Sequence, residues 1–419
     1  MPAPKQVNAL TEHLFRQEAG KLVAVLTRLF GPGYIQLAED IVQDTLLAAT
    51  LDWTSGSIPD NPAAWITQVA KRKALNELRR LQTVRKHQDD LTLGQGVTST
   101  EVETIFMDSE IRDSQLRMIF TCCHPALALE SQIALTLKTL CGFSVPEVSR
   151  ALLSSEITIN KRLYRAKQKI RNQSIPFDIP SGSDLDIRLN AVCLTLYLLF
   201  NEGYNSTHHE VLIRKSLCAE AMRLTRLLTQ HFDHRPELQA LLALMCFHAA
   251  RFESRLDRHG AIVIFEEQNR NLWDQQLIAT GMSCLKKATT GNLLTSYHLE
   301  AGIAAEHCTA PDFASTNWPS IYNQYERLYQ LKPSAIIQLN LAIVYSQIST
   351  TQDAILRLEQ LLHDKALENY YLLPATLGSL YFKTNQRMKA QFYFKKAREL
   401  TLAQSAIDFF DRQIAACQS

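Results

Sequence analysis

The chain has 419 residues, 46% of them hydrophobic and 21% charged, with a formal net charge of +2 at pH 7. This is the composition of an ordinary globular protein with room for two or three domains. The N-terminal residues lack the basic start and apolar core of a secretory signal, and the longest apolar runs are too short to cross a bilayer. We therefore exclude a secreted or membrane-spanning protein and expect a cytoplasmic one.

The whole chain is predicted to be helical. Long stretches are rich in Ala, Leu, Gln, Glu, Lys and Arg, with few Gly residues and few Val/Thr alternations. We expect an all-α protein with a helical domain at residues 1–81, a polar linker at 82–108, a second helical domain at 109–176 and a helical extension at 185–419. The Pro/Gly/Ser-rich segment "NQSIPFDIPSGSD" separates the second domain from the extension.

A polar face is predicted in the segment 37–50, "LAEDIVQDTLLAAT". Asp40, Gln43 and Asp44 fall at i, i+3 and i+4 of the predicted helix, so their side chains share one side of it. Such a face can meet a basic partner surface, and it can equally be an ordinary solvated acidic face. The spacing alone leaves both interpretations open.

The segment 61–80 predicts a basic amphipathic helix that begins with an Asn61 cap followed by Pro62. Apolar residues at helical spacing supply one side, and Trp65 is expected there in the core rather than as a stacking surface. Seven basic residues and one acid lie between Lys71 and Lys86. This charge indicates a nucleic-acid surface or a solvated helix face. The polar side comprises Lys71, Arg72, Lys73, Asn76, Arg79 and Arg80.

Two adjacent cysteines and a histidine, Cys122, Cys123 and His124, precede a proline in "TCCHPAL". These residue types suggest a metal or redox site. Adjacent side chains on a helix diverge by roughly 100°, however, which is poor for joint chelation. The nine cysteines form no C-x-x-C motif, which argues against a zinc-ribbon or thioredoxin-type site. We expect the thiols in a helical core, His124 at a helix end, and no catalytic residue, metal or cofactor.

The segment 143–171 predicts two helices joined by a tight turn. Ser144-x-x-Glu147 forms a capping box, and Ser155 can cap the second helix. An apolar stripe in that second helix consists of Ile159, Leu163, Ala166 and Ile170. The other side carries Thr158, Lys161, Arg162, Arg165 and Lys169. The pattern favours a helix-turn-helix whose second helix enters a DNA major groove; an ordinary helical hairpin is the alternative.

The extension opens with a short polar signature. Asn201, Glu202, Gly203 and Tyr204 stand at the end of an apolar helix, with Gly203 as its expected stop. His208 and His209 follow, but their spacing differs from that of a metal-binding H-E-x-x-H motif. We therefore expect turn and capping roles here rather than a metal site.

A repeat occurs near the C-terminus. Ala342, Tyr345 and Ala354 recur 36 residues later as Gly378, Tyr381 and Ala390. This period is close to the tetratricopeptide unit of about 34 residues. Small residues at 378 and 390 would let two helices approach, while Tyr381 and Phe394 fill the space between them. We expect a short helical solenoid, with an irregular helical bundle as the alternative.

Taken in order, these motifs resemble a known family. The segments "LAEDIVQDTLLAAT" and "NPAAWITQVAKRKALNELRR", the polar linker and the helix-turn-helix resemble an RNA polymerase sigma-70 family sigma factor of the small extracytoplasmic-function type. "TCCHPALALESQIALTLKTLCGFSVPEV" and "YLLFNEGY" are similar to the subgroup with a tetratricopeptide-like C-terminal extension. The resemblance covers nearly the whole chain.

The resemblance implies a function in transcription initiation without enzymatic activity. It implies that Asp40, Gln43 and Asp44 bind the β′ coiled coil of core RNA polymerase, with a further contact to the β flap. The helix at 61–80 would contact the promoter −10 element, and the helix-turn-helix the −35 element. Asn201 to Tyr204 would mark the subgroup, and the extension would regulate the factor by binding a protein or a small ligand.

Two other functions fit parts of the sequence. A repeat-type interaction scaffold with a DNA-tethering N-terminal half would not need both basic segments intact. An enzyme would need a nucleophile, a base and an orienting group, and no motif supplies that set. Because both basic segments are intact, we expect a sigma factor.

Overall fold

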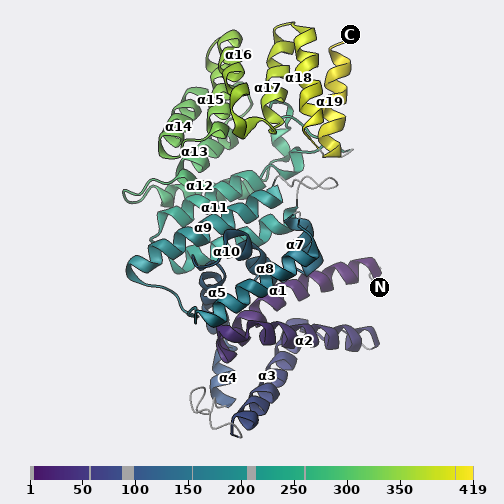
Figure 1. Ribbon diagram of the computed structural model, residues 1–419, viewed down its shortest axis with the longest axis vertical. Helices are drawn as coiled ribbons and strands as arrows, with labels where there is room; N and C mark the ends of the chain where they lie inside the picture. The colour runs from purple at the N-terminus through teal and green to yellow at the C-terminus, as the bar shows by residue number, and fades with distance from the viewer. Residues whose placement is uncertain are drawn as a thin grey trace. The chain divides into compact units, whose positions relative to one another are not determined.

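The computed structural model describes residues 4–55, 58–86, 99–152, 154–204, 214–258, 261–401 and 403–418. Within those ranges the protein is all-α, as predicted, with nineteen α-helices, several 3₁₀ turns and one isolated β-bridge (Figure 1). The chain divides into two compact units, Met1–Leu198 and Leu199–Ser419. None of the helices within these ranges is long and apolar enough to cross a membrane.

Three long helices open the first unit. α1 (Pro4–Phe30) stops at Gly31, whose positive φ of 92° suits glycine, and the 3₁₀ turn η1 (Pro32–Tyr34) leads into α2 (Ile35–Ser55). α3 (Pro62–Lys86) begins as predicted, because the N–H of Ala64 donates to Oδ1 of Asn61 at 3.1 Å. The predicted apolar side of α3 is fully buried at Ile66, Ala70 and Ala74.

Shorter helices complete this part of the first unit. They are α4 (Ser99–Ile105), α5 (Asp108–Cys122), α6 (Leu129–Thr139), α7 (Val145–Ala151) and α8 (Glu156–Asn172). The predicted linker at 82–108 needs correction, since α3 continues to Lys86 and α4 lies inside it; residues 87–98 lie outside the described residues. α4 buries Val102 and contacts α1 and α5. A seven-residue helix held by so little apolar surface gives no periodic signal in the sequence.

α7 and α8 form the predicted helix-turn-helix. The capping box is present: Ser144 accepts from the N–H of Glu147, and Glu147 accepts from the N–H of Ser144 at 2.7 Å. Ser155 caps α8 by accepting from the N–H of Thr158 at 3.2 Å. The predicted apolar stripe is the buried side of α8, formed by Ile159, Leu163, Ala166 and Ile170.

α1 packs tightly against the corner between α6 and α7. A Cβ atom added to Gly20 would lie 2.0 Å from the carbonyl oxygen of Leu140. Gly142 follows with a φ of +67°, and a Cβ added there would lie 2.5 Å from the carbonyl oxygen of Arg16. Because backbone meets backbone at both places, only glycine allows this approach.

α9 (Gly182–Tyr204) is one continuous helix that contains the boundary between the two units. The extension was expected from residue 185, whereas residues 185–198 belong to the first unit. Two contacts explain this: the Arg188 guanidinium lies 5.6 Å from the centre of the Phe120 ring, and Thr195 donates to Gln132 at 3.1 Å. The Pro/Gly/Ser-rich segment before α9 marks the start of this helix. It does not mark the boundary between the units, because the first part of α9 packs in the first unit.

The second unit is a succession of helices in which neighbours along the chain mostly pack together. The α-helices are α10 (Lys215–His231), α11 (Pro236–Ala249), α12 (Gln275–Ala288), α13 (Ser296–Thr309), α14 (Trp318–Leu331), α15 (Ala335–Ile348), α16 (Thr351–Gln360), α17 (Leu372–Lys383), α18 (Arg387–Glu399) and α19 (Gln404–Ala416). The 3₁₀ turns are η2 (Phe252–Ser254), η3 (Phe265–Glu267), η4 (Arg270–Leu272), η5 (Leu361–His363) and η6 (Lys365–Leu367).

The predicted packing of the second repeat copy is present between α17 and α18, which lie side by side with α19 (Figure 1). A Cβ added to Gly378 would lie 2.7 Å from the Phe394 ring, so glycine is what brings the helices together. Tyr381 and Ala390 are buried in the same core. In the first copy Ala342 and Ala354 are buried too, which gives both helix pairs the same inner positions.

Candidate nucleic-acid interface

The outer side of α8 is the strongest candidate for a DNA contact. Lys161 and Arg165 are exposed one turn apart, and Thr158 and Arg162 beside them are half-buried. The Thr158 hydroxyl lies 2.9 Å from Oγ of Ser155, so this side chain is fixed by the helix cap. The N-terminal half of α8 thus presents cations away from the core, as a helix that enters a major groove does.

Two exposed apolar side chains extend this surface, and the sequence pattern did not single them out. Ile157 is 68% exposed and Tyr164 is 65% exposed. They stand at helical spacing from Lys161 and Arg165, on the side away from the buried stripe. Apolar side chains can contact thymine methyl groups in the major groove, so they belong to the candidate surface. Their position outside the apolar stripe was the available signal.

The C-terminal half of α8 packs on α2 instead. Nζ of Lys167 donates to Oε2 of Glu39 at 2.6 Å and to Oε1 of Gln36 at 2.8 Å. The Lys167 side chain is 14% exposed and that of Glu39 is 4% exposed, so water reaches this ion pair poorly. Lys169 is exposed, and its Nζ donates to the carbonyl oxygen of Ala126. Lys167 therefore holds two parts of the protein together.

The other basic helix, α3, displays most of its predicted polar side. Arg72, Asn76, Arg79 and Arg80 are exposed. Arg80 forms an ion pair with Glu77 at 2.6 Å, one turn earlier on the same helix. Exposed cations along one side of a helix suit contacts with a nucleic-acid backbone.

The half-buried residues of α3 connect it to its neighbours. Lys71 pairs with Glu103 of α4 at 3.3 Å, and Nζ of Lys73 donates to the carbonyl oxygen of Asp44 in α2 at 3.1 Å. Trp65 is half-buried and lies edge-on to Trp53, with ring centres 5.6 Å apart. Trp65 thus packs against α2 but is not fully buried, so its expected core position holds only in part.

The predicted partner face on α2 is exposed at Asp40, Gln43 and Asp44. Leu47 and Leu51 continue the same face, and they are 58% and 62% exposed. Exposed leucines in line with acidic side chains are typical of a surface that another protein covers. Neither leucine belongs to the predicted face, although both follow Gln43 at a spacing of four residues.

Cys122 and Cys123 are fully buried, which confirms their predicted place in a helical core. Their Sγ atoms contact the hydroxyls of Thr139 at 3.2 Å and Thr136 at 3.6 Å. Burial raises the pKa of both thiols, to about 11 for Cys123, which disfavours the reactive thiolate. His124 accepts from the N–H of Ala126 at 3.2 Å, just beyond the end of α5. No cluster of three metal-ligating side chains occurs in the described ranges.

The signature at the end of α9 packs against α10 and α11 of the second unit. A Cβ added to Gly203 would lie 2.7 Å from Sγ of Cys218. The Tyr204 ring lies 3.9 Å from the Arg255 guanidinium and 4.6 Å from the His248 ring. Asn201 and Glu202 are half-buried, and burial raises the pKa of Glu202 to about 7. His208, His209 and Glu210 lie outside the described residues.

Comparison with known families assigns the segments that contain α3 and α8. Residues 14–84 match the family model described as sigma-70 region 2, and residues 117–170 match sigma-70 region 4. The chain belongs to the RNA polymerase sigma-70 family. Members of this family are non-enzymatic transcription initiation factors that bind promoter DNA and core RNA polymerase. α2 and α3 therefore lie in region 2 of this sigma factor, and α8 is the second helix of the region 4 helix-turn-helix.

Two further comparisons concern the rest of the chain. Residues 188–289 match a family of unknown function, DUF6596. An uncharacterized protein of Rhizobium meliloti (strain 1021) is 31% identical over 381 residues, which are 91% of this chain and 90% of that protein. The sigma regions and the helices that follow them thus occur together in a relative of similar length.

Proposed function

We propose that this protein is an extracytoplasmic-function type sigma factor that works in the cytoplasm and directs core RNA polymerase to promoters with specific −10 and −35 elements. The observation that carries the proposal is α8, which is capped by Ser155, buries its apolar stripe and exposes Lys161 and Arg165. Regions 2 and 4 are joined by a short connection between residues 84 and 117, which supports the small two-region type.

In this proposal each DNA element has its own helix. α8 reads the −35 element through Thr158, Lys161, Arg162 and Arg165, while Lys169 contacts phosphate. α3 contacts the −10 element through Lys71, Arg72, Lys73, Asn76, Arg79 and Arg80. Cations on one side of α3 follow the backbone of melted DNA, as in other single-strand binding surfaces.

The polymerase contact in this proposal is the exposed face of α2. Asp40, Gln43 and Asp44 meet the basic β′ coiled coil, and Leu47 and Leu51 add apolar area to that contact. Region 4 reaches the β flap. The experiment is titration of labelled core polymerase with the full chain. We expect Asp44→Arg to weaken binding at least tenfold and Asp411→Arg, an exposed change in α19, to leave it unchanged. Equal binding by both variants would contradict the assignment of this face.

We further infer that the C-terminal helices are a tetratricopeptide-like extension that regulates the sigma regions through a bound protein or small ligand. The shared inner positions of the two repeat copies support the repeat assignment. A chain that ends at Leu198 retains Arg188 and Thr195, which pack in the first unit. We expect its transcription activity to differ from that of the full chain; identical profiles would argue against regulation by the extension.

A further inference from the structure

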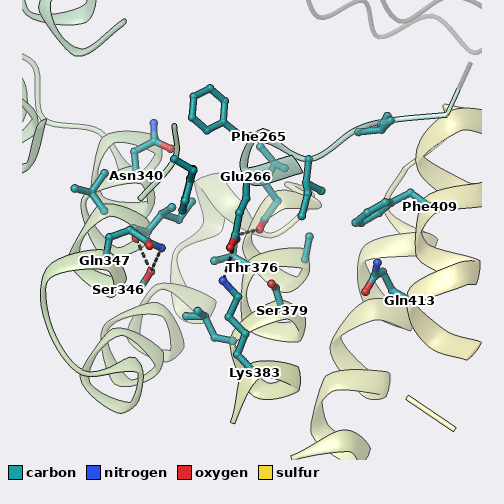
Figure 2. A pocket seen from close by; sticks show the side chains of 18 of the residues that line it. Phe265, Glu266, Asn340, Ser346, Gln347, Thr376, Ser379, Lys383, Phe409 and Gln413 are labelled. Atoms are coloured by element: carbon teal, nitrogen blue, oxygen red, sulfur yellow. Dashed lines mark hydrogen bonds and ion pairs between the residues drawn. The ribbon is translucent and has the colours of Figure 1, made fainter. Parts of the chain in front are cut away.

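A cavity of about 470 Å³ lies within the second unit, lined by α15, α17, α19 and the segment 262–266. Figure 2 shows Asn340 and Gln347 of α15 on one side, Phe409 and Gln413 of α19 on the other, and Thr376 of α17 between them. Cavities of roughly 300–1,000 Å³ are the usual size of small-molecule sites. The size alone therefore suits a compact ligand.

The lining is aromatic with a few neutral polar groups. Phe265, Trp318, Tyr371, Phe394 and Phe409 supply ring surface from five different parts of the unit. The polar side chains in the same lining include the amides of Asn340, Gln347 and Gln413 and the hydroxyls of Thr376 and Ser379. Amides and hydroxyls both donate and accept hydrogen bonds, so they can orient a neutral ligand.

The charges in the lining cancel. Its two charged side chains are Glu266 and Lys383, and they pair with each other at 3.1 Å (Figure 2). His307, also in the lining, is neutral at physiological pH because burial lowers its pKa to about 3. An ionic ligand that enters the cavity would lose its hydration. The lining has no unpaired charge to compensate for that loss, so binding of an ion is unfavourable.

His307 contributes ring surface to the lining. Nδ1 of His307 is buried and has no hydrogen-bond partner among the described residues. Because this nitrogen has almost no accessible surface, a ligand contacts the ring of His307 and not Nδ1. His307 lies beside aromatic rings, 4.7 Å from Phe265 and 5.4 Å from Trp318 between ring centres. An aromatic ligand would find further ring contacts here.

The segment 262–266 makes a long peptide a poor fit. The N–H of Val263 bonds to the carbonyl oxygen of Arg255 at 3.0 Å, and the Phe265 ring lies 4.1 Å from the Arg251 guanidinium. Glu266 then reaches Lys383 of α17. Because the chain's own backbone crosses the helix faces at this point, an extended peptide would have to displace it.

We propose that this cavity is a binding site for an uncharged, mainly apolar small molecule that carries an aromatic ring and one or two hydrogen-bonding groups. The ligand's ring lies among the aromatic side chains, and the amides of α15 and α19 orient its polar groups. The site uses residues of the second unit alone, so the binding test below can fail or succeed separately from the transcription test of the proposed function.

The test uses two fluorescent probes with the same ring skeleton and the full-length protein. N-Phenyl-1-naphthylamine is uncharged, and 8-anilinonaphthalene-1-sulfonate adds one sulfonate. We expect the uncharged probe to bind saturably at one site per chain and at least tenfold more tightly than the sulfonate. Equal or tighter binding of the sulfonate, or no saturable binding of the uncharged probe, would overturn the proposal.

Two variants locate the probe. Ser379→Trp fills the cavity from α17 and Gln413→Trp fills it from α19, whereas Ser283→Trp places the same ring at an exposed position on α12. We expect at least tenfold weaker probe binding in the two cavity variants and wild-type binding in the control. Circular dichroism melting identifies a variant that has lost its fold, and the other cavity variant then decides. Wild-type affinity in a folded cavity variant would place the probe elsewhere and overturn the proposal.

Discussion

The two basic helices of the sigma regions are both rich in Lys and Arg, but they differ in which of these side chains are exposed. α3 of region 2 exposes Arg72, Arg79 and Arg80 along its outer side, whereas α8 of region 4 exposes Lys161 and Arg165 and commits Lys167 to Glu39 of region 2. A count of basic residues predicts both surfaces but not this division. Only the fold shows which cations are exposed and which one joins the two regions.

Region 2 and region 4 are held together at more than one place. Gly20 lies against the backbone of Leu140, and Arg28 pairs at 2.6 Å with Glu110 of α5, the helix that leads into region 4. The buried Lys167–Glu39 pair adds a third contact. The surface that we propose reads DNA and the surface that packs on region 2 are thus two halves of one helix, α8.

The largest expected effect tests the close approach of the two regions. Gly20→Ala would place a Cβ 2.0 Å from the Leu140 carbonyl oxygen, while Gly33→Ala would meet its nearest atom at an ordinary 3.5 Å. We expect Gly20→Ala to lower the free energy of unfolding by about 3 kcal/mol, although alanine favours a helix over glycine by about 1 kcal/mol. Urea unfolding measures the difference. Gly33→Ala should stay close to wild type; a stable Gly20→Ala would refute the contact.

The next effect separates the two halves of α8. Arg165→Ala should weaken binding to a cognate −35 duplex by about 2 kcal/mol if Arg165 contacts base edges, because a bidentate contact is worth about that much discrimination. Fluorescence anisotropy with cognate and scrambled duplexes measures it. An equal loss on both duplexes would instead assign Arg165 to the phosphate backbone.

The third prediction concerns Glu202, whose carboxyl group is half-buried, in contrast to the exposed cations of α8. Burial raises the pKa of Glu202 to about 7, so the folded chain holds this proton more tightly than the unfolded chain does. The protonated carboxyl group therefore stabilises the folded chain. This contribution is fully present below pH 4.5 and is lost as pH rises through 7. Partial exposure reduces the effect to about 1 kcal/mol. The melting temperature of Glu202→Gln should therefore fall less between pH 5 and 8 than that of wild type. The exposed change Glu368→Gln should keep the wild-type profile.

The smallest effect compares two neighbours on α3. Arg79→Ala should reduce the slope of log affinity against log salt for single-stranded −10 DNA by about 0.7, the value for one phosphate contact. Arg80→Ala should reduce it less, because Arg80 already pairs with Glu77. Salt titrations of DNA binding give both slopes. The reverse order would show that the Glu77 pair opens when DNA binds.

Local chemistry was the part that the sequence predicted well. The Asn61, Ser144 and Ser155 caps and the buried stripe of α8 depend on residues three or four positions apart, and all are present. The same holds for Gly378 against Phe394, because a repeat pattern relates two adjacent helices.

Long-range packing was what the sequence could not supply. Residues far apart in the chain meet in the Gly20–Leu140 contact and in the Lys167–Glu39 pair. The short helix α4 inside the predicted linker likewise packs on the distant helix α1. The cavity beneath the segment 262–266 likewise depends on residues more than one hundred positions apart, such as Glu266 and Lys383. No periodicity of a single helix encodes such contacts.

The central claim is that the two sigma regions of this chain select promoters for core RNA polymerase. Run-off transcription with purified core polymerase and the full chain, on a library of promoter templates, tests it most directly. We predict discrete start sites that depend on the added chain, that weaken strongly with Arg165→Ala and that persist with Lys395→Ala, an exposed change on α18. Transcription without any start-site selection by the chain would contradict the account.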